Sequence, residues 1–316
     1  MPMAGTNGAN VGGVPSAGEG GAAAGAGGAT SGAGGAASVA GNNSMAGTDS
    51  SAAGAGGMAG TMDIGACCDN GGCVCHGDVP RALTSEDGPY ETELYDIADV
   101  GCVYYPTDAE PPFAALAFND GLAGLGGCFS SATPGWGPFY ASHGIVVITV
   151  SATRDALPPQ RGETLAHGIA VLKAENENVD SPLFEKLAGR YGVAGFSMGG
   201  GGATYAAQTD PSFLTNVVIM PFEPVDGTVT IPTLLICGSN DGIAPCDAHG
   251  LPFYDGIDVG VAKMRVTVSS GHAGQPSTGG GSTGAVALAF QKVFLEGDER
   301  WRALLLGAAS DDTNIP

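Results

Sequence analysis

Short apolar runs alternate with amphipathic stretches from Tyr90 onward. Apolar residues at helical spacing predict two long helices, RGETLAHGIAVLKAEN and GAVALAFQKVFLEG, and the second should end at Gly297. The runs that predict strands are YETELYDI, CVYYPTD, FAALAF, GIVVITVS, YGVAGF, NVVIMPF, IPTLLICG and KMRVTVSS. Because strands alternate with helices, the pattern predicts an α/β fold with a mostly parallel central sheet and helices on both faces.

The two ends of the chain differ in composition from its middle. Residues 1–62 are almost wholly Gly, Ala, Ser, Thr, Asn and Met, so they have little apolar surface to bury, and they predict a disordered tether. A cysteine-rich segment follows at residues 63–89. Residues 90–300 are long enough for one domain with a well-buried core. The polar end GAASDDTNIP predicts a flexible tail over residues 301–316.

The formal net charge of −21 excludes some partners. It disfavours contacts with nucleic-acid phosphates and with anionic lipid. No apolar run reaches the length of about 18 residues that a transmembrane helix needs, and MPMAGTNGAN lacks the features of a signal peptide. A low-complexity tether before a cysteine-bearing domain is typical of a mature exported protein. We therefore expect a protein that is secreted or tethered at the cell surface. We also expect it to be a monomer.

The cysteines predict disulfide bonds rather than a metal site. The cluster ACCDNGGCVCH lacks the second CxxC or the paired histidines that a tetrahedral zinc site needs, which favours a disulfide knot, and no other cluster demands a metal. Spacing alone does not give the connectivity. The eight cysteines are Cys67, Cys68, Cys73, Cys75, Cys102, Cys128, Cys237 and Cys246.

A candidate nucleophile lies between a predicted strand and a predicted helix. Residues 195–199 read GFSMG and match the motif G-x-S-x-G. The flanking glycines are needed because the chain turns sharply there and a side chain would collide with its neighbours. YGVAGF supplies the strand before Ser197, and GGGGATYAAQ can form the helix after it. The context therefore favours an α/β-hydrolase nucleophile over an ordinary glycine-rich turn.

A serine nucleophile needs an acid and a base, which follow it along the chain in this fold. Asp241 comes directly after the strand segment IPTLLICGSN, at the strand end where sites in open α/β sheets gather, although SNDG could also be a simple turn. The competing carboxylates without that placement are Asp226, Asp247 and Asp255. Asp241 is therefore the predicted acid.

Two histidines follow Asp241 along the chain. His272 lies in SSGHAG, a loop between the last predicted strand and the last helix, which can bring its imidazole over Ser197. His249 lies before or within a short helical stretch, which is the wrong segment to supply the base for Ser197. We predict that Ser197, Asp241 and His272 form a catalytic triad.

An oxyanion would need two backbone donors near Ser197. One is the N–H of Met198, the residue after the nucleophile. The other should come from the loop NDGLAGLGGC, where Leu122 is the predicted donor and Gly126 is an alternative.

The chain offers little room for a cap over the site. About ten residues separate NVVIMP from IPTLLICG, where other hydrolases insert a helical lid. We therefore expect no cap domain and an open, shallow cleft. Phe222 and Trp136 are candidate aromatic surfaces beside it; either could instead be a core residue, which for Trp136 is the favoured interpretation.

With these residues placed, the chain from about Tyr90 to Gly297 resembles the poly(ethylene terephthalate) hydrolase and bacterial cutinase family. The matching segments, in order, are GWGPFYASHGIVVITV, PPQR, GFSMGGGGA, TVTIPTLLICGSNDGIAP, LPFYDGI and SGHAG. The resemblance implies a lidless serine esterase that needs no cofactor, with the triad on Ser197, Asp241 and His272.

Three aromatic positions of that family differ here. Phe196 stands where a Trp usually precedes the nucleophile, and Phe222 stands where a Trp usually stacks on the substrate. Leu122 or a glycine replaces the aromatic residue that usually supplies the second oxyanion donor. Phe196 and Phe222 are therefore the predicted substrate-binding side chains, with less ring surface for an aromatic polyester.

The family resemblance also bears on the cysteines. Some members anchor the histidine loop with a disulfide, but no cysteine follows His272 closely here. We expect Cys128 and Cys246, from two loops near the site, to pair instead. Cys237 lies within a predicted strand and would be a buried free thiol.

These features predict a serine carboxylic-ester hydrolase that acts on polyester or short-chain esters through an acyl-enzyme on Ser197. One alternative is an esterase or lactonase for small molecules. Another is a surface-displayed hydrolase-like domain that serves in adhesion without catalysis.

Overall fold

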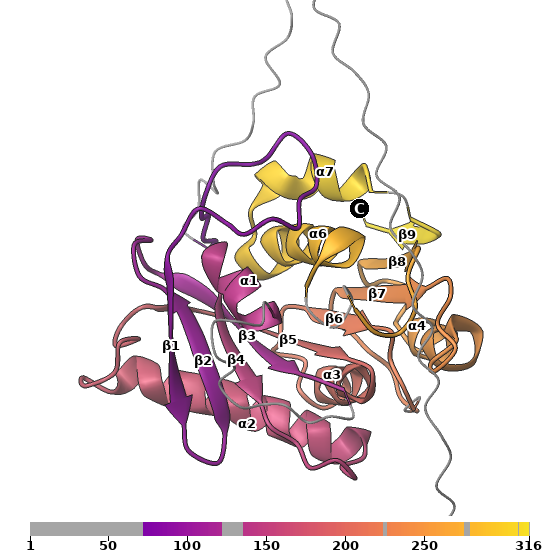
Figure 1. The fold of residues 1–316 in the computed structure, drawn as a ribbon, viewed down its shortest axis with the longest axis horizontal. Helices are drawn as coiled ribbons and strands as arrows, with labels where there is room; N and C mark the ends of the chain where they lie inside the picture. Colours follow the sequence, from indigo (N-terminus) through magenta and orange to yellow (C-terminus); the bar gives the residue numbers. More distant parts are fainter. Residues whose placement is uncertain (1–71, 122–134, 224–225, 275–278, 309, 316) are drawn as a thin grey trace, which may run out of the picture. The chain divides into compact units, whose positions relative to one another are not determined.

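One mixed sheet organises the part of the chain that the computed structural model describes, residues 72–121, 135–223, 226–274, 279–308 and 310–315 (Figure 1). The chain divides into two units, 1–59 and 60–316, and all described residues belong to the second. The strands of the sheet are β1 (Thr92–Ile97), β2 (Gly101–Pro106), β3 (Phe113–Asn119), β4 (Val146–Val150), β5 (Leu187–Phe196), β6 (Asn216–Ile219), β7 (Thr233–Gly238), β8 (Lys263–Val268) and β9 (Asp312–Asn314). Their order is β1-β2-β4-β3-β5-β6-β7-β8-β9.

The centre of the sheet is parallel and its edges are antiparallel. Strands β4, β3, β5, β6, β7 and β8 pair in parallel, whereas β1 with β2, β2 with β4 and β8 with β9 are antiparallel. Every residue of β3, β6 and β7 is buried, as the continuous apolar runs predict for strands covered on both faces.

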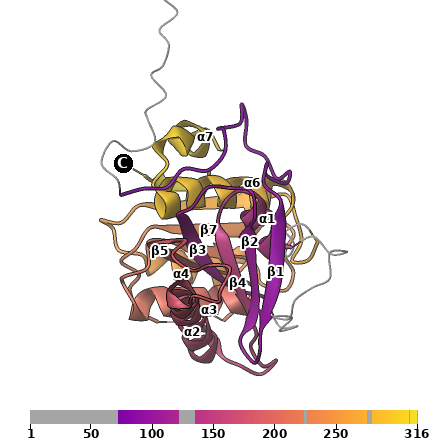
Figure 2. The same cartoon turned by 90° about the vertical axis from the view of Figure 1, so that its left-hand side faces the viewer.

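Helices cover both faces of the sheet. The α-helices are α1 (Trp136–Ser142), α2 (Pro158–Glu177), α3 (Met198–Thr209), α4 (Leu251–Asp255), α6 (Gly281–Phe290) and α7 (Arg302–Leu306). Shorter turns are η1 (Cys246–Gly250) and η2 (Gln291–Glu296), both π-helical, and the 3₁₀ turn η3 (Glu299–Trp301). Helices α2 and α3 lie on one face, with α1, α6 and α7 on the other (Figure 2), and a separate apolar core fills each side. The α/β-hydrolase architecture predicted from the sequence is confirmed.

No helix is inserted between β6 and β7 in the described residues 220–223 and 226–232. The carboxyl ends of the parallel strands therefore carry only loops at that point, which agrees with the expected lack of a cap. None of the described helices combines the length and hydropathy that crossing a bilayer would require.

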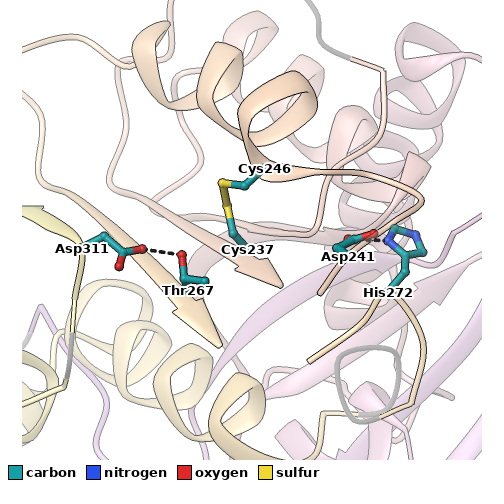
Figure 3. The surroundings of a disulfide bond; sticks show 6 residues. All are labelled: Cys237, Asp241, Cys246, Thr267, His272 and Asp311. Carbon is teal, nitrogen blue, oxygen red and sulfur yellow. Dashed lines mark hydrogen bonds and ion pairs between the residues drawn. A yellow bond between two sulfur atoms is a disulfide. The ribbon is translucent and has the colours of Figure 1, made fainter. Parts of the chain in front are cut away.

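The predicted flexible tail is wrong for the described part of residues 301–316. Trp301 is 2% exposed, α7 follows it, and β9 pairs with the edge strand β8. Asp311 also accepts a hydrogen bond from Thr267 Oγ1 of β8 at 2.5 Å (Figure 3). Composition did not predict this ordered structure for two reasons. A single buried tryptophan is enough to anchor the segment. The unpaired backbone groups of an edge strand also bind a polar segment as readily as an apolar one.

The described part of the cysteine-rich segment is tied to the domain although it forms no helix or strand. Val74 is buried, and its N–H donates to the carbonyl of Glu296 at 2.9 Å. Cys73 and Cys75 are each disulfide-bonded, which supports the disulfide interpretation over zinc, whereas Cys67 and Cys68 lie outside the described residues. The segment is thus part of the folded unit.

Behind this segment lies a buried ionic cluster of Lys292, Glu296, His76 and His143. The Lys292 ammonium donates to Glu296 Oε2 at 2.9 Å and to the carbonyls of His143 at 2.6 Å and His76 at 3.2 Å. Glu296 Oε1 lies 3.3 Å from His76 Nδ1, and both Lys292 and Glu296 are at most 1% exposed. One lysine therefore joins η2, α1 and the cysteine-rich segment.

The imidazole of His143 should make stability depend on pH. Burial, reinforced by the charge of Lys292, lowers its pKa to about 4 from the ordinary value of 6.5. The unfolded chain therefore binds one more proton between these values, and the free energy of unfolding should fall by about 3 kcal/mol as the pH drops from 6.5 to 4.

His143→Gln should flatten this dependence, because its amide can still donate to the carbonyl of Glu86, which lies 3.0 Å from His143 Nε2, but does not titrate. Urea unfolding at pH 4.5, 5.5 and 7 measures the slope. The exposed His167 gives the matched control His167→Gln, which should keep the wild-type slope. Equal slopes for His143→Gln and wild type would contradict the assignment.

Candidate active site

Ser197 lies at a strained turn between β5 and α3. Its backbone has φ 57° and ψ −122°, outside the regions that ordinary residues occupy. A Cβ built on Gly195 would collide with the carbonyl of Gly199, and one built on Gly199 would collide with that of Asn119. The glycines of the GFSMG motif are therefore required by space, as the sequence predicted.

The structure brings Ser197, Asp241 and His272 together from three loops at the carboxyl ends of the strands. His272 Nε2 lies 2.8 Å from Ser197 Oγ, and His272 Nδ1 lies 2.7 Å from Asp241 Oδ2. Because an ionised carboxylate can only accept, Nδ1 carries the ring proton and Nε2 of the neutral imidazole accepts from the serine hydroxyl. The three groups are thus ordered for proton transfer.

The loop around Asp241 holds its carboxylate from the other side. Asp241 Oδ1 accepts from the N–H groups of Ile243 at 2.9 Å and Ala244 at 2.8 Å, and the Asp241 side chain is fully shielded from solvent. Hydrogen bonds on both oxygens fix the carboxylate toward His272. The three competing carboxylates are exposed: Asp226, Asp247 and Asp255.

The backbone near Ser197 can provide an oxyanion site. Met198 is the first residue of α3, and N–H groups in a first helical turn have no carbonyl partner within the helix. From the other side Gly121 approaches so closely that an added Cβ would lie 3.0 Å from Ser197 Cβ. The predicted second donor Leu122 and its alternative Gly126 lie outside the described residues.

The aromatic side chains near the site have separate surroundings. Phe196 is buried, with its ring centroid 5.0 Å from that of His272. Phe222 is half-buried and stacks on His249, with centroids 4.6 Å apart and the ring planes at 20°. Trp136 is buried in the core against Phe118, which is the interpretation that the sequence favoured.

His249 is the residue beside the site that sequence reasoning missed. His272, and not His249, lies within hydrogen-bonding distance of Ser197 Oγ, but the ring of His249 extends the surface of Phe222. Its Nδ1 also lies 3.4 Å from the N–H of Glu223. The sequence did contain a signal for this position, because His249 follows Asp241 closely in the segment after the carboxyl end of β7.

Two cysteine predictions are wrong. Cys246 is bonded to Cys237 rather than to Cys128, so Cys237 is not a free thiol (Figure 3). The pair closes the loop that carries Asp241, with Cys237 at the end of β7 and Cys246 at the start of η1. The sequence did not predict this bond because a cysteine within a buried apolar strand is typical of a core residue. Only the folded structure shows that the loop with Cys246 returns to Cys237. Cys128 lies outside the described residues.

Known proteins resemble this chain over most of the domain. The model of a family described as PET hydrolase-like matches residues 78–315. This match spans the whole described site. The chain belongs to the PET hydrolase-like family.

Several named proteins are similar to this chain. Bis(hydroxyethyl) terephthalate hydrolase of Streptomyces coelicolor is 29% identical over 234 residues, which cover 69% of this chain and 71% of the relative. Cutinase 1 of Thermobifida cellulosilytica is 27% identical over 241 residues, covering 72% and 88%. A cutinase of Thermobifida fusca is also 27% identical over 241 residues, covering 72% and 77%.

The site is built for acyl transfer by side chains and backbone groups. Within the described residues, no group of three or more His, Cys, Asp or Glu side chains is placed to hold a metal ion. The arrangement offers a nucleophile, a base, an acid that orients the base, and a helix N-terminus toward which negative charge can develop.

Proposed function

We propose that this protein is a serine carboxylic-ester hydrolase that acts on polyester chains or short-chain esters. The observation that carries the proposal is the chain of contacts from Ser197 Oγ through His272 to Asp241, at 2.8 and 2.7 Å. Membership of the PET hydrolase-like family supports it.

The contacts give each residue a role in the reaction. Ser197 Oγ attacks the ester carbonyl carbon while His272 Nε2 takes its proton, and the N–H of Met198 stabilises the negative charge on the carbonyl oxygen. The protonated imidazole then gives its proton to the departing alcohol, leaving an acyl-enzyme. Water, deprotonated by the same imidazole, releases the acid and restores Ser197. Asp241 holds the ring and stabilises its positive form throughout.

The surroundings favour esters with an accessible, extended shape. The described residues between β6 and β7 form no lid, and the Phe222–His249 stack offers a flat aromatic surface. Relatives are named for cutin and for bis(hydroxyethyl) terephthalate, both ester substrates. Disulfides at Cys73, Cys75, Cys102, Cys237 and Cys246 support our proposal that the enzyme works outside the cell.

A substrate panel tests the function. The purified protein should release product from a chromogenic short-chain ester, from a soluble aromatic diester and from an amorphous aromatic polyester film. An aryl fluorophosphonate should abolish this activity and add its mass to the peptide that contains Ser197. Absence of hydrolysis on every substrate, together with no labelling, would overturn the proposal; activity on soluble esters alone would restrict it to small substrates.

Phe222→Ala should separate aromatic from aliphatic substrates. Loss of the ring should lower kcat/KM for the soluble aromatic diester by up to about tenfold, mainly through KM, because stacking supports bound substrate and transition state alike. The short aliphatic ester is the control and should change by less than about twofold. His249→Ala removes the stacking partner of Phe222 and should show a smaller effect of the same kind. Equal losses on both ester types would exclude an aromatic subsite here.

A further inference from the structure

Arg161 lies behind the candidate active site and has no part in the triad chemistry. It is in the first turn of α2 and is fully buried. Its Nη1 donates to Asn119 Oδ1 at 2.9 Å, to the carbonyl of Asp120 at 3.2 Å and to that of Gly121 at 3.3 Å. A single nitrogen thus contacts three consecutive residues at the end of β3 and in the loop that follows.

The rest of the guanidinium secures Arg161 itself. Nε donates to the carbonyl of Ala156 at 2.9 Å, and Nη2 approaches the carbonyl of Thr153 at 3.4 Å and Met198 Sδ at 3.9 Å. The end of β3 with the described start of the loop after it, residues 119–121, and Met198, the residue after the nucleophile, therefore contact the same buried cation.

Burying this charge is costly, and none of the hydrogen bonds that the guanidinium makes to described residues reaches a carboxylate. Burial lowers the pKa of Arg161, although the charges of Asp120 and Glu223 act in the opposite direction. Its acceptors are carbonyl and amide oxygens together with one sulfur. A planar fork with five donors can hold several carbonyls in fixed directions, which an apolar residue of similar volume cannot do.

The loop that Arg161 holds lies against the nucleophile. A Cβ on Gly121 would lie 3.4 Å from Ser197 Oγ, so this backbone is in near contact with the reacting group. The Gly121 N–H is already committed to Asp120 Oδ1 at 2.7 Å.

We propose that Arg161 is a positioning residue that fixes residues 119–121 and Met198 against Ser197 and so preorganises the backbone around the nucleophile for the transition state. The inference rests on the proposed ester hydrolysis. Preorganised donors act on charge that develops in the transition state, so losing their support should lower kcat more than it raises KM.

Arg161→Lys, which keeps the charge but loses the fork, tests this role. On a soluble chromogenic ester, kcat should fall by about 10- to 100-fold while KM changes by less than about threefold. Affinity for an aryl boronic acid, which forms a tetrahedral adduct on the serine, should fall by a factor similar to that of kcat/KM. In Arg161→Ala, guanidinium chloride at low millimolar concentration should restore part of kcat.

Arg190→Lys is the matched control. The guanidinium of Arg190 also donates to main-chain carbonyls, but these belong to Leu295, Phe294 and Gly72, which are not part of the candidate active site. It should lower the melting temperature and leave kcat unchanged. If Arg161→Lys lost only thermal stability and kept wild-type kcat at 20 °C, the positioning role would be wrong. If the wild type hydrolysed no ester, the proposed function would fail instead. Should Arg161→Ala not fold, the lysine variant alone decides.

Discussion

Ser197→Ala should lower kcat for a soluble ester by about 10⁴- to 10⁶-fold. The reason is that Ser197 Oγ is the group within 2.8 Å of His272 Nε2, and without it no acyl-enzyme can form. The backbone donors remain and account for the residual rate. Initial rates on a chromogenic ester, corrected for spontaneous hydrolysis, measure the loss.

Combinations within the triad should be far from additive. Ser197→Ala with His272→Ala should be no slower than Ser197→Ala alone, because the base has no role once its proton donor is gone. Asp241→Asn should by itself cost on the order of 10⁴ in kcat, since the ring would lose its proper tautomer. Ser269→Ala, an exposed position on the loop toward His272, is the control and should retain full activity. Additive losses in the double variant would contradict a proton relay.

Lys292→Met should destabilise the fold by about 3–5 kcal/mol, because it leaves the carboxylate of Glu296 buried without its cation. Lys292 is 1% exposed and Glu296 is fully buried. The change also removes donors from the carbonyls of His76 and His143. Urea unfolding followed by circular dichroism at pH 7 measures the difference in free energy.

The double variant Lys292→Met with Glu296→Gln distinguishes a buried charge from lost packing. Removing the second charge should recover part of the loss, so the two changes should couple by more than about 1 kcal/mol. Lys173→Met serves as the control, because Lys173 is exposed over the ring of Tyr191, and it should cost less than about 1 kcal/mol. Simple additivity of the double variant would mean that the ion pair does not stabilise η2.

Local patterns were enough to predict the sheet and the three side chains that the structure brings together as a candidate triad. Each predicted strand run corresponds to a strand, because period and apolar content report how a segment is buried. Ser197 directly follows a strand, and Asp241 and His272 lie in the loops that follow two others, while parallel strands place their carboxyl ends at the same end of the sheet. Their approach to within hydrogen-bonding distance was therefore implied by order along the chain.

Composition misled where a few contacts outweigh many polar residues. The tail around β9 has a polar sequence, yet Trp301 and the open edge of β8 give it a place on the domain. Cys237 reads as a core residue, and only the return of η1 over the end of β7 brings Cys246 to it. Residue spacing along the chain predicts neither the pairing of β9 with β8 nor the Cys237–Cys246 bond, because both depend on how the chain folds back in three dimensions.

The sequence by itself determined the α/β fold and the Ser-His-Asp constellation, since both follow from short-range periodicity and from the direction of parallel strands. The tertiary structure alone decided the Cys237–Cys246 bond, the stacking of Phe222 on His249, and the buried cations Arg161 and Lys292. A lone arginine or lysine in a helix reads as a solvated side chain. Whether it is buried, and which carbonyls it holds, depends on the segments packed around it.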